Sequence, residues 1–149
     1  MTETEMITDT TDGQPVQSPL QAMAEHIRDS GAAMVLACDV VQGEIVVRVN
    51  ASDAAAALAM LRDDRQAAFT QLIDITAVDY PDRKYRFDMI YQMLSMQNNM
   101  RLRLVAAVGE GQAVPSATGV FLAANWAERE VWDMFGIFFS GHPDLRRLL

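Results

Sequence analysis

Two short segments in the first half of the chain repeat hydrophobic residues at helical spacing. The first runs from Pro19 to Ser30, and the glycine that follows it favours a helix end. Its apolar side consists of Leu20, Met23, Ala24 and Ile27. The second begins after Asn50, Ser52 or Asp53, each of which can cap a helix. Its apolar positions are Ala54, Ala57, Leu58 and Leu61. Both patterns predict amphipathic helices that pack on a core.

Five other segments have the hydrophobic pattern of β-strands. They are residues 34–40, 44–49, 72–78, 85–94 and 101–108. Gln42-Gly43 between the first two predicts a two-residue hairpin turn. Four acids stand near strand ends, where solvation or turn capping explains them. These acids are Asp74, Asp79, Asp82 and Asp88. The order of elements predicts an α+β domain whose mostly antiparallel sheet is covered by helices.

A last helix is predicted from near Ser116, which follows Pro115 and can cap it, to Gly136, which suits a left-handed helix end. On a helical wheel one side is apolar and meets the core. It consists of Val120, Phe121, Ala124, Ala127, Val131 and Phe135. The opposite side consists of Asn125, Trp126, Arg129, Glu130 and Asp133. A Gly141-His142-Pro143 turn follows this helix.

Glu128 projects at the margin of that apolar side, where an ionised carboxylate is costly unless it is paired. We therefore predict a cationic partner, Arg146 or Arg147, after the chain reverses at the turn. Trp126 lies on the polar side beside Glu130, and a large aromatic residue among charges is typical of a subunit contact. Trp126 is therefore the best interface candidate.

Chemical roles are weaker interpretations of the same residues. Arg129 and Asp133 are four residues apart, so solvation of an exposed pair explains them as well as function does. The acids of the last helix have no nucleophile, phosphate loop or metal cluster nearby in the sequence, which argues against catalysis. His142 favours a turn residue that donates a hydrogen bond, because the other histidine, His26, lies on an unrelated segment. No metal site is predicted.

Composition limits the remaining classes. The 149 residues, of which 50% are hydrophobic, suit one domain over residues 19–149 after a polar, disordered tail over residues 1–18. The net charge of -8 argues against nucleic-acid binding. The single cysteine, Cys38, lies in an apolar run that predicts a buried, inert thiol, and it cannot supply a disulfide or an ordinary four-cysteine metal site. No apolar run approaches the ~20 residues of a membrane span, and the acidic start lacks an export signal.

The segment from residue 128 to 149 resembles the signature of the C-subunit family of the proton-pumping NADH:quinone oxidoreductase, respiratory complex I, and of related subunits in membrane-bound hydrogenases. The residues that carry it are Glu128, Arg129, Glu130, Asp133, Gly136, Gly141, His142, Pro143, Asp144, Arg146 and Arg147. Weaker similarity lies in residues 72–81, 86–95 and 114–116, so the resemblance covers about residues 20–149 in family order.

The resemblance implies a non-catalytic scaffold subunit of the peripheral arm, on the cytoplasmic face of the bacterial inner membrane. Its partners would be the quinone-site subunit and the terminal iron–sulfur subunit of complex I. It would hold no cofactor, because FMN and the iron–sulfur clusters belong to other subunits, and it would support electron transfer from NADH to quinone within the assembly. The alternatives are the equivalent subunit of an energy-converting hydrogenase or formate-oxidising complex, and a free-standing binding module.

Relatives of this kind usually continue past the Arg-Arg-Leu-Leu at residues 146–149 through a second Gly-His-Pro and a basic, aromatic tail. The tail helps relatives to hold the neighbouring subunit. We therefore expect a fragment or a short natural variant whose core folds and whose docking is weakened.

Overall fold

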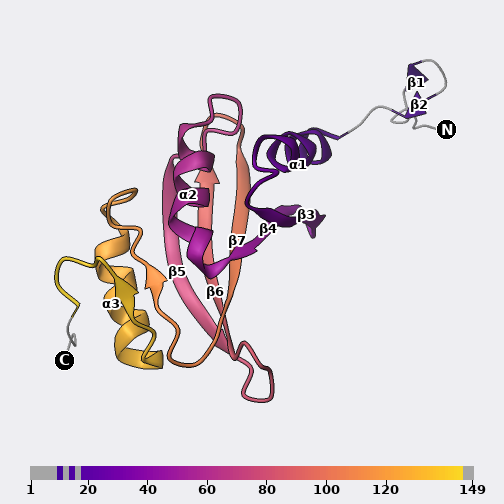
Figure 1. The fold of residues 1–149 in the computed structure, drawn as a ribbon. Helices are drawn as coiled ribbons and strands as arrows, with labels where there is room; N and C mark the ends of the chain where they lie inside the picture. The colour runs from indigo at the N-terminus through magenta and orange to yellow at the C-terminus, as the bar shows by residue number, and fades with distance from the viewer. Residues whose placement is uncertain (1–9, 12–13, 16–17, 146–149) are drawn as a thin grey trace.

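The computed structural model describes residues 10–11, 14–15 and 18–145 (Figure 1). Strands β1 (Thr10–Thr11) and β2 (Gln14–Pro15) pair antiparallel with each other. The rest of residues 1–17, and residues 146–149, lie outside the described part. The predicted disordered tail over residues 1–18 and the single domain over 19–149 therefore stay predictions.

A five-stranded sheet forms the centre of the fold and has the order β3-β4-β7-β6-β5. Its strands are β3 (Val35–Val41), β4 (Glu44–Asn50), β5 (Gln71–Asp79), β6 (Phe87–Ser95) and β7 (Met100–Val108). Neighbouring strands are antiparallel except β4 and β7, which are parallel. The predicted α+β class and mostly antiparallel sheet are confirmed, with strand ends within two residues of the prediction.

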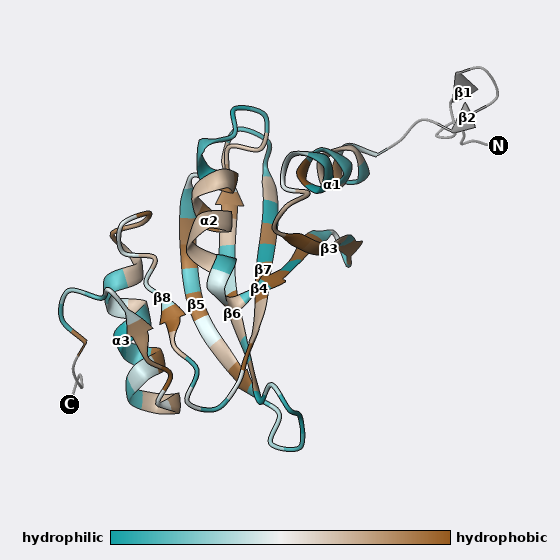
Figure 2. Cartoon of the chain, in the orientation of Figure 1, coloured by the Kyte–Doolittle hydropathy of each residue, from teal (hydrophilic) through white to brown (hydrophobic). Residues whose placement is uncertain are grey.

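Local sequence explains the first hairpin and the inner face of the sheet. Gln42 and Gly43 have φ values of 50° and 79°, which is the type I′ geometry of a two-residue hairpin. Along β6, Phe87, Met89 and Tyr91 are buried at every second position. Figure 2 shows hydrophobic and hydrophilic residues alternating along the strands. One face of the sheet is therefore apolar and needs a cover.

Two helices supply most of that cover (Figure 1). Helix α1 (Pro19–Ser30) has the predicted bounds, and the Ser18 Oγ accepts a hydrogen bond from the Gln21 amide at 3.1 Å. Helix α2 (Ala54–Asp63) follows a 3-10 turn at Ala51–Asp53. The predicted side-chain cap is not formed there, because Asn50 and Asp53 make no capping hydrogen bond. The apolar sides of both helices join the core.

The outer edge of β3 is protected by α1. The Arg28 guanidinium donates a hydrogen bond of 2.5 Å to the Cys38 carbonyl. The Cys38 thiol is buried and donates to the Ala24 carbonyl at 3.4 Å. Burial raises the pKa of this thiol to about 11, so it is protonated and unreactive at neutral pH. The predicted buried, inert cysteine is confirmed.

The predicted start of the last helix is wrong. Helix α3 is Ala124–Phe135 and begins eight residues after Ser116. Residues 117–123 form turns instead, in which the Ala117 carbonyl accepts from the Val120 and Phe121 amides. Thr118 and Gly119 are poor helix formers, and Ser116 bonds a side chain of α3 rather than capping. Strands β8 (Val114–Pro115) and β9 (Phe139–Ser140), which the sequence pattern did not predict, pair in parallel beside α3.

Tyr91 gives a stability prediction. Its side chain is fully buried, and its hydroxyl has no hydrogen-bond partner among the described residues. A buried hydroxyl without a partner costs free energy, so Tyr91→Phe should raise the free energy of unfolding by about 1 kcal/mol. Urea denaturation of both proteins measures this change. A loss of more than about 1 kcal/mol would show that the hydroxyl has a stabilising partner.

Candidate docking site on the last helix

Glu128 anchors α3 to the segment before it. Its side chain is fully buried, with an exposed fraction of 0%. One carboxylate oxygen accepts from the Ser116 Oγ at 2.6 Å, and the other accepts from the Ala117 amide at 2.6 Å. Charge-assisted hydrogen bonds of this length are among the stronger polar contacts in proteins. The carboxylate therefore fixes the position of α3 against the β8 end.

The electrostatics of this anchor are set mainly by burial. Burial raises the pKa of the Glu128 carboxyl above its ordinary value, while the hydrogen bonds from Ala117 and Ser116 and the nearby His142 oppose the rise. Burial, and next the charge of Glu128, also raise the pKa of the Tyr91 phenol. The anchor thus joins α3, the β8 end and the sheet core in one buried polar cluster.

His142 fastens the turn after β9 to α3. Its Nδ1 accepts from the Asp144 amide at 2.9 Å, which leaves the proton on Nε2 to donate to the Asn125 carbonyl at 3.1 Å. The same Nε2 lies 3.9 Å from a Glu128 carboxylate oxygen, and both side chains are buried. Gly141 has a φ of 82°, and Pro143 is exposed beyond it. His142 therefore has a positional role here.

Arg146 and Arg147 lie outside the described residues, so their predicted pairing with Glu128 stays a prediction. Within the described part, Glu128 is satisfied by an amide and a hydroxyl instead of by an arginine. Neutral donors do not cancel the negative charge, which is why burial still dominates the pKa of this carboxyl.

The outer side of α3 exposes a group of large side chains. Trp126 is 58% exposed, and the Arg129 guanidinium lies 5.5 Å from the centroid of its ring system. Leu122 and Met134 are also exposed. Phe138 stacks edge-on against Trp132 with 6.2 Å between ring centroids. We call Leu122, Trp126, Arg129, Met134 and Phe138 the α3 surface. Its mixture of aromatic, Met and Arg side chains is typical of protein interfaces.

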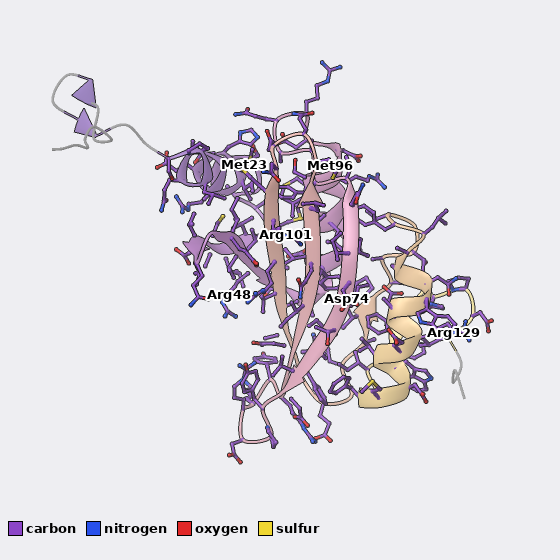
Figure 3. The ribbon with its side chains drawn as sticks, turned by 180° about the vertical axis from the view of Figure 1, so that it is seen from behind. Met23, Arg48, Asp74, Met96, Arg101 and Arg129 are labelled. Carbon is purple, nitrogen blue, oxygen red and sulfur yellow. The ribbon has the colours of Figure 1, made fainter. Side chains whose placement is uncertain are left out.

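The acids of α3 lie on two sides of this helix. Glu130 is exposed and, with Met134, lines a groove of about 140 Å³ whose other wall is formed by Asp74 and Thr76 of β5. Asp133 is half-buried and makes an interaction within the protein. Helix α3 runs beside β5 in Figure 1, and Figure 3 shows Arg129 on this helix from behind.

Gly136 ends α3 in the left-handed region, as predicted, with a φ of 72°. A Cβ added there meets no atom within 4 Å, so only backbone strain opposes a side chain. We expect Gly136→Ala to lower the free energy of unfolding by about 1 kcal/mol. The matched control is Gly119→Ala, where space is equally open and φ is not left-handed, and it should be nearly neutral. Equal effects in thermal unfolding would contradict this explanation.

A second polar cluster was missed by sequence reasoning. The Arg86 guanidinium forms two hydrogen bonds to the Asp79 carboxylate, at 2.7 and 2.9 Å, and a third to Glu110 at 3.2 Å. The guanidinium lowers the pKa of Asp79. Asp88 likewise pairs with Arg83. The interpretation of Asp79 and Asp88 as merely solvated or capping residues is therefore wrong.

The signal for this cluster was present in the sequence. The turn between β5 and β6 closes through a hydrogen bond of 2.7 Å from the Tyr80 amide to the Arg86 carbonyl. Asp79 and Arg86 flank this turn, so a hairpin brings them together. With Glu110, Phe135 and Gly136 they line a cavity of about 290 Å³ at the end of α3.

The described residues show neither a metal-binding cluster nor a membrane-spanning helix. Within residues 10–11, 14–15 and 18–145, no group of three or more His, Cys, Asp or Glu is arranged to hold a metal ion. In the same part of the chain, no helix combines the length and the apolar character needed to cross a membrane.

Comparison with known families and proteins gives a consistent result. The family described as "Respiratory-chain NADH dehydrogenase, 30 Kd subunit" matches residues 47–149. The NADH-quinone oxidoreductase C-subunit from Rhodobacter capsulatus is 50% identical over 130 residues, which are 87% of this chain and 65% of that protein. The protein of the same name from Methylobacterium radiotolerans is 49% identical over 138 residues, which are 91% of this chain and 64% of that protein. The chain thus spans just under two thirds of these relatives.

Solved structures show the same fold. The trypsin-resistant fragment (1-134) of Nqo5 is 29% identical, with a TM-score of 0.65 over 85% of this chain and 98% of the fragment. A chain of the membrane-bound sulfane sulfur reductase, an archaeal respiratory membrane complex, has a TM-score of 0.71 at 21% identity. It covers 81% of this chain and 70% of that chain, and at this identity the likeness concerns the fold alone.

Proposed function

Because this chain belongs to the family of the respiratory-chain NADH dehydrogenase 30-kDa subunit, we propose that it is a non-catalytic scaffold subunit of proton-translocating NADH:quinone oxidoreductase. It holds no cofactor, and electron transfer from NADH to quinone takes place in neighbouring subunits that carry FMN and iron–sulfur clusters. Its place is the peripheral arm, on the cytoplasmic face of the inner membrane. Its neighbours are the quinone-site subunit and the terminal iron–sulfur subunit.

The main structural support for this proposal is the α3 surface, because it shows how a scaffold subunit could contact a partner. A scaffold subunit needs a rigid element that presents anchoring side chains to a partner. The buried Glu128 carboxylate fixes α3 through two hydrogen bonds of 2.6 Å. On the other side of the helix Trp126 faces outward, and the guanidinium of the half-buried Arg129 lies over its ring. Rigid support lowers the entropy lost when a partner binds. We propose this surface as the main contact with the quinone-site or the terminal iron–sulfur subunit.

The residues of the turn extend the same surface. Gly141, Pro143 and Asp144 are exposed next to α3, and His142 pins them to the helix through the Asn125 carbonyl. Glu130 adds an exposed acid beside Met134. The signature residues therefore divide into two groups. Glu128, Gly136 and His142 set the shape of the unit, and the exposed residues contact the partner.

Affinity purification in mild detergent tests this proposal. The tagged chain, expressed in a bacterium whose own copy is deleted, is purified from membranes, and the proteins that accompany it are identified by mass spectrometry. We expect the flavin-bearing NADH-binding subunits together with the quinone-site and terminal iron–sulfur subunits. A nickel–iron hydrogenase large subunit in their place would assign the chain to an energy-converting hydrogenase. Purification of the chain alone would contradict a scaffold role.

A further inference from the structure

One face of the central sheet is covered by neither α1 nor α2, and α3 lies only beside its β5 edge. Helices α1 and α2 bury the face that carries Ile45 and Val47 of β4. Strand alternation places Val46 and Arg48 on the opposite face. Figure 3 shows that face toward the viewer, with Arg48, Arg101 and Asp74 on it and α2 behind the strands.

The strand register identifies which residues share this face. Val46 of β4 lies beside Arg103 of β7, and Arg48 lies beside Val105. Val105 in turn lies beside Ile90 of β6. The open face is the set of Val46, Arg48, Ile90, Arg101, Arg103 and Val105. These residues come from three adjacent strands, so they form one continuous surface.

We propose that the open face is a second docking surface, and that it binds an acidic segment of a neighbouring subunit in the complex. This inference rests on the proposed function. It adds a specific contact, with a stated chemistry, on the side of the sheet opposite α1 and α2.

Two of the three arginines on the open face have no carboxylate partner within the described residues. The protein has a net charge of -8, yet three arginines gather on two adjacent strands of this face. Arg103 has a carboxylate partner, Glu44, at 3.3 Å. Arg48 and Arg101 are exposed, and neither forms an ion pair within the described residues. Arg48 lies beside Val105, four residues along β7 from Arg101. Each of the two guanidinium groups therefore leaves a separate positive charge that an external acid can complement.

The apolar residues between the arginines are the second argument. Val105 is almost fully buried by its neighbours, and Val46 and Ile90 are half-buried on the pleated surface. They form an apolar strip on the sheet, with Arg48 beside Val105 and Arg103 beside Val46. Interfaces combine such a strip with arginine more often than free surface does, because the long arginine side chain packs on the partner while its charge is paired.

The pattern of charges favours a protein over a membrane. Two acids lie on the same face, one at each edge. Asp39 of β3 lies beside Val46, and Asp74 of β5 lies beside Gln92, which in turn lies beside Arg103. A uniformly anionic lipid surface would be repelled by these acids and by the overall negative charge of the protein. A protein segment can place its acids opposite the arginines and away from Asp39 and Asp74. A second copy of this chain would bring like-charged arginines together near the two-fold axis.

The first test compares two charge-reversal variants in assembled membranes. The variant Arg48→Glu with Arg101→Glu changes the open face, and the control Arg65→Glu with Lys84→Glu makes the same charge change on exposed loops. We expect the first variant to lower the amount of co-purified complex by roughly tenfold, because each reversed charge repels the acidic segment. The control should assemble like the wild type, and the isolated variants should melt within a few degrees of it.

The second test identifies the occupant. Arg48→Lys keeps the positive charge and supplies an amine, which a water-soluble carbodiimide couples to a carboxylate in contact, with loss of water to the reagent. We expect cross-links in the purified complex to aspartate or glutamate of another subunit. Cross-links only to the four acids within residues 1–17 of the same chain would overturn the proposal, and so would cross-links between two copies.

Failure of this inference can be told apart from failure of the proposed function. If the wild-type chain brings no respiratory subunits with it, the proposed function fails. If the wild type does so and the charge-reversal variant assembles equally well, only the docking surface fails. A membrane role is checked with vesicles of anionic phospholipid. The proposal of a protein partner would also be contradicted if the wild-type chain bound these vesicles, the charge-reversal variant did not, and both assembled equally well.

Discussion

Replacing Glu128 with alanine should lower the free energy of unfolding by about 3 kcal/mol, which corresponds to a fall in melting temperature of roughly 10 °C. The substitution removes both hydrogen bonds of 2.6 Å and leaves the buried Ala117 amide without an acceptor. Ser116 loses less, because its hydroxyl also contacts the Thr118 hydroxyl at 2.9 Å. Thermal unfolding of the purified chain, followed by circular dichroism, measures the loss.

Glu128→Gln is the matched control for that loss. The glutamine amide oxygen can still accept from the Ala117 amide, and its NH₂ group can donate to the Ser116 hydroxyl, which rotates to accept. The loss should therefore be less than about 1 kcal/mol. Equal losses for Ala and Gln would show that the negative charge itself, and not the hydrogen bonds, holds α3 in place.

The stability difference between the wild type and Glu128→Gln should depend on pH, and the direction of this dependence can be predicted. Burial raises the pKa of the Glu128 carboxyl above the ordinary value of 4.5, so the folded protein favours the protonated form. This group's contribution to stability is fully present below the pKa of the unfolded chain, and it is lost as the pH rises through the folded pKa. The wild type should therefore lose stability relative to Glu128→Gln as the pH rises above 4.5. A constant difference between pH 4 and pH 8, by contrast, would show that the pKa is not raised.

Trp126→Ala should weaken assembly while it spares the isolated chain. The side chain is 58% exposed, so its removal costs the monomer little, and the melting temperature should fall by no more than a few degrees. At an interface, a Trp anchor next to an arginine is worth about 2 kcal/mol or more, which corresponds to a loss of roughly 30-fold in affinity. The amount of complex that accompanies the tagged chain measures the effect.

Met96→Ala is the control for this second variant. Met96 is a large apolar side chain of similar exposure, and Figure 3 shows it at the end of the sheet, away from α3. Its truncation should leave assembly unchanged. Equal effects of the two substitutions would mean that assembly responds to any exposed apolar residue. A large loss of monomer stability in Trp126→Ala would place the indole in the core packing instead.

Local rules explain most of what the sequence predicted. The bounds of α1, the Gln42-Gly43 turn and the end of α3 at Gly136 follow from short-range features: a Ser cap, positive φ at two turn residues and a left-handed glycine. The burial of alternate residues along β6 follows from the pleat. Each of these features needs only neighbours within a few residues.

Long-range contacts explain what was missed. The start of α3 depends on Glu128, whose carboxylate binds Ser116 twelve residues earlier and holds that segment in turns. The parallel pairing of β4 with β7, and of β8 with β9, joins strands that are far apart in the sequence. Periodicity predicts on which side of a helix or strand a residue lies, and it does not predict what packs against that side. The sequence therefore placed Glu128 at the margin of the apolar side, although its side chain is among the most buried.

The most direct measurement is electron transfer from NADH to quinone in membranes of cells that lack this chain, compared with cells that express it in its full gene context. We predict that membranes without the chain lose quinone reduction and the assembled complex on native gels, while NADH oxidation by a small artificial acceptor persists in released flavin-bearing subunits. Expression of the wild-type chain should restore both, and Trp126→Ala should restore them only in part. Full quinone reduction by a normally assembled complex in the absence of the chain would contradict the scaffold role.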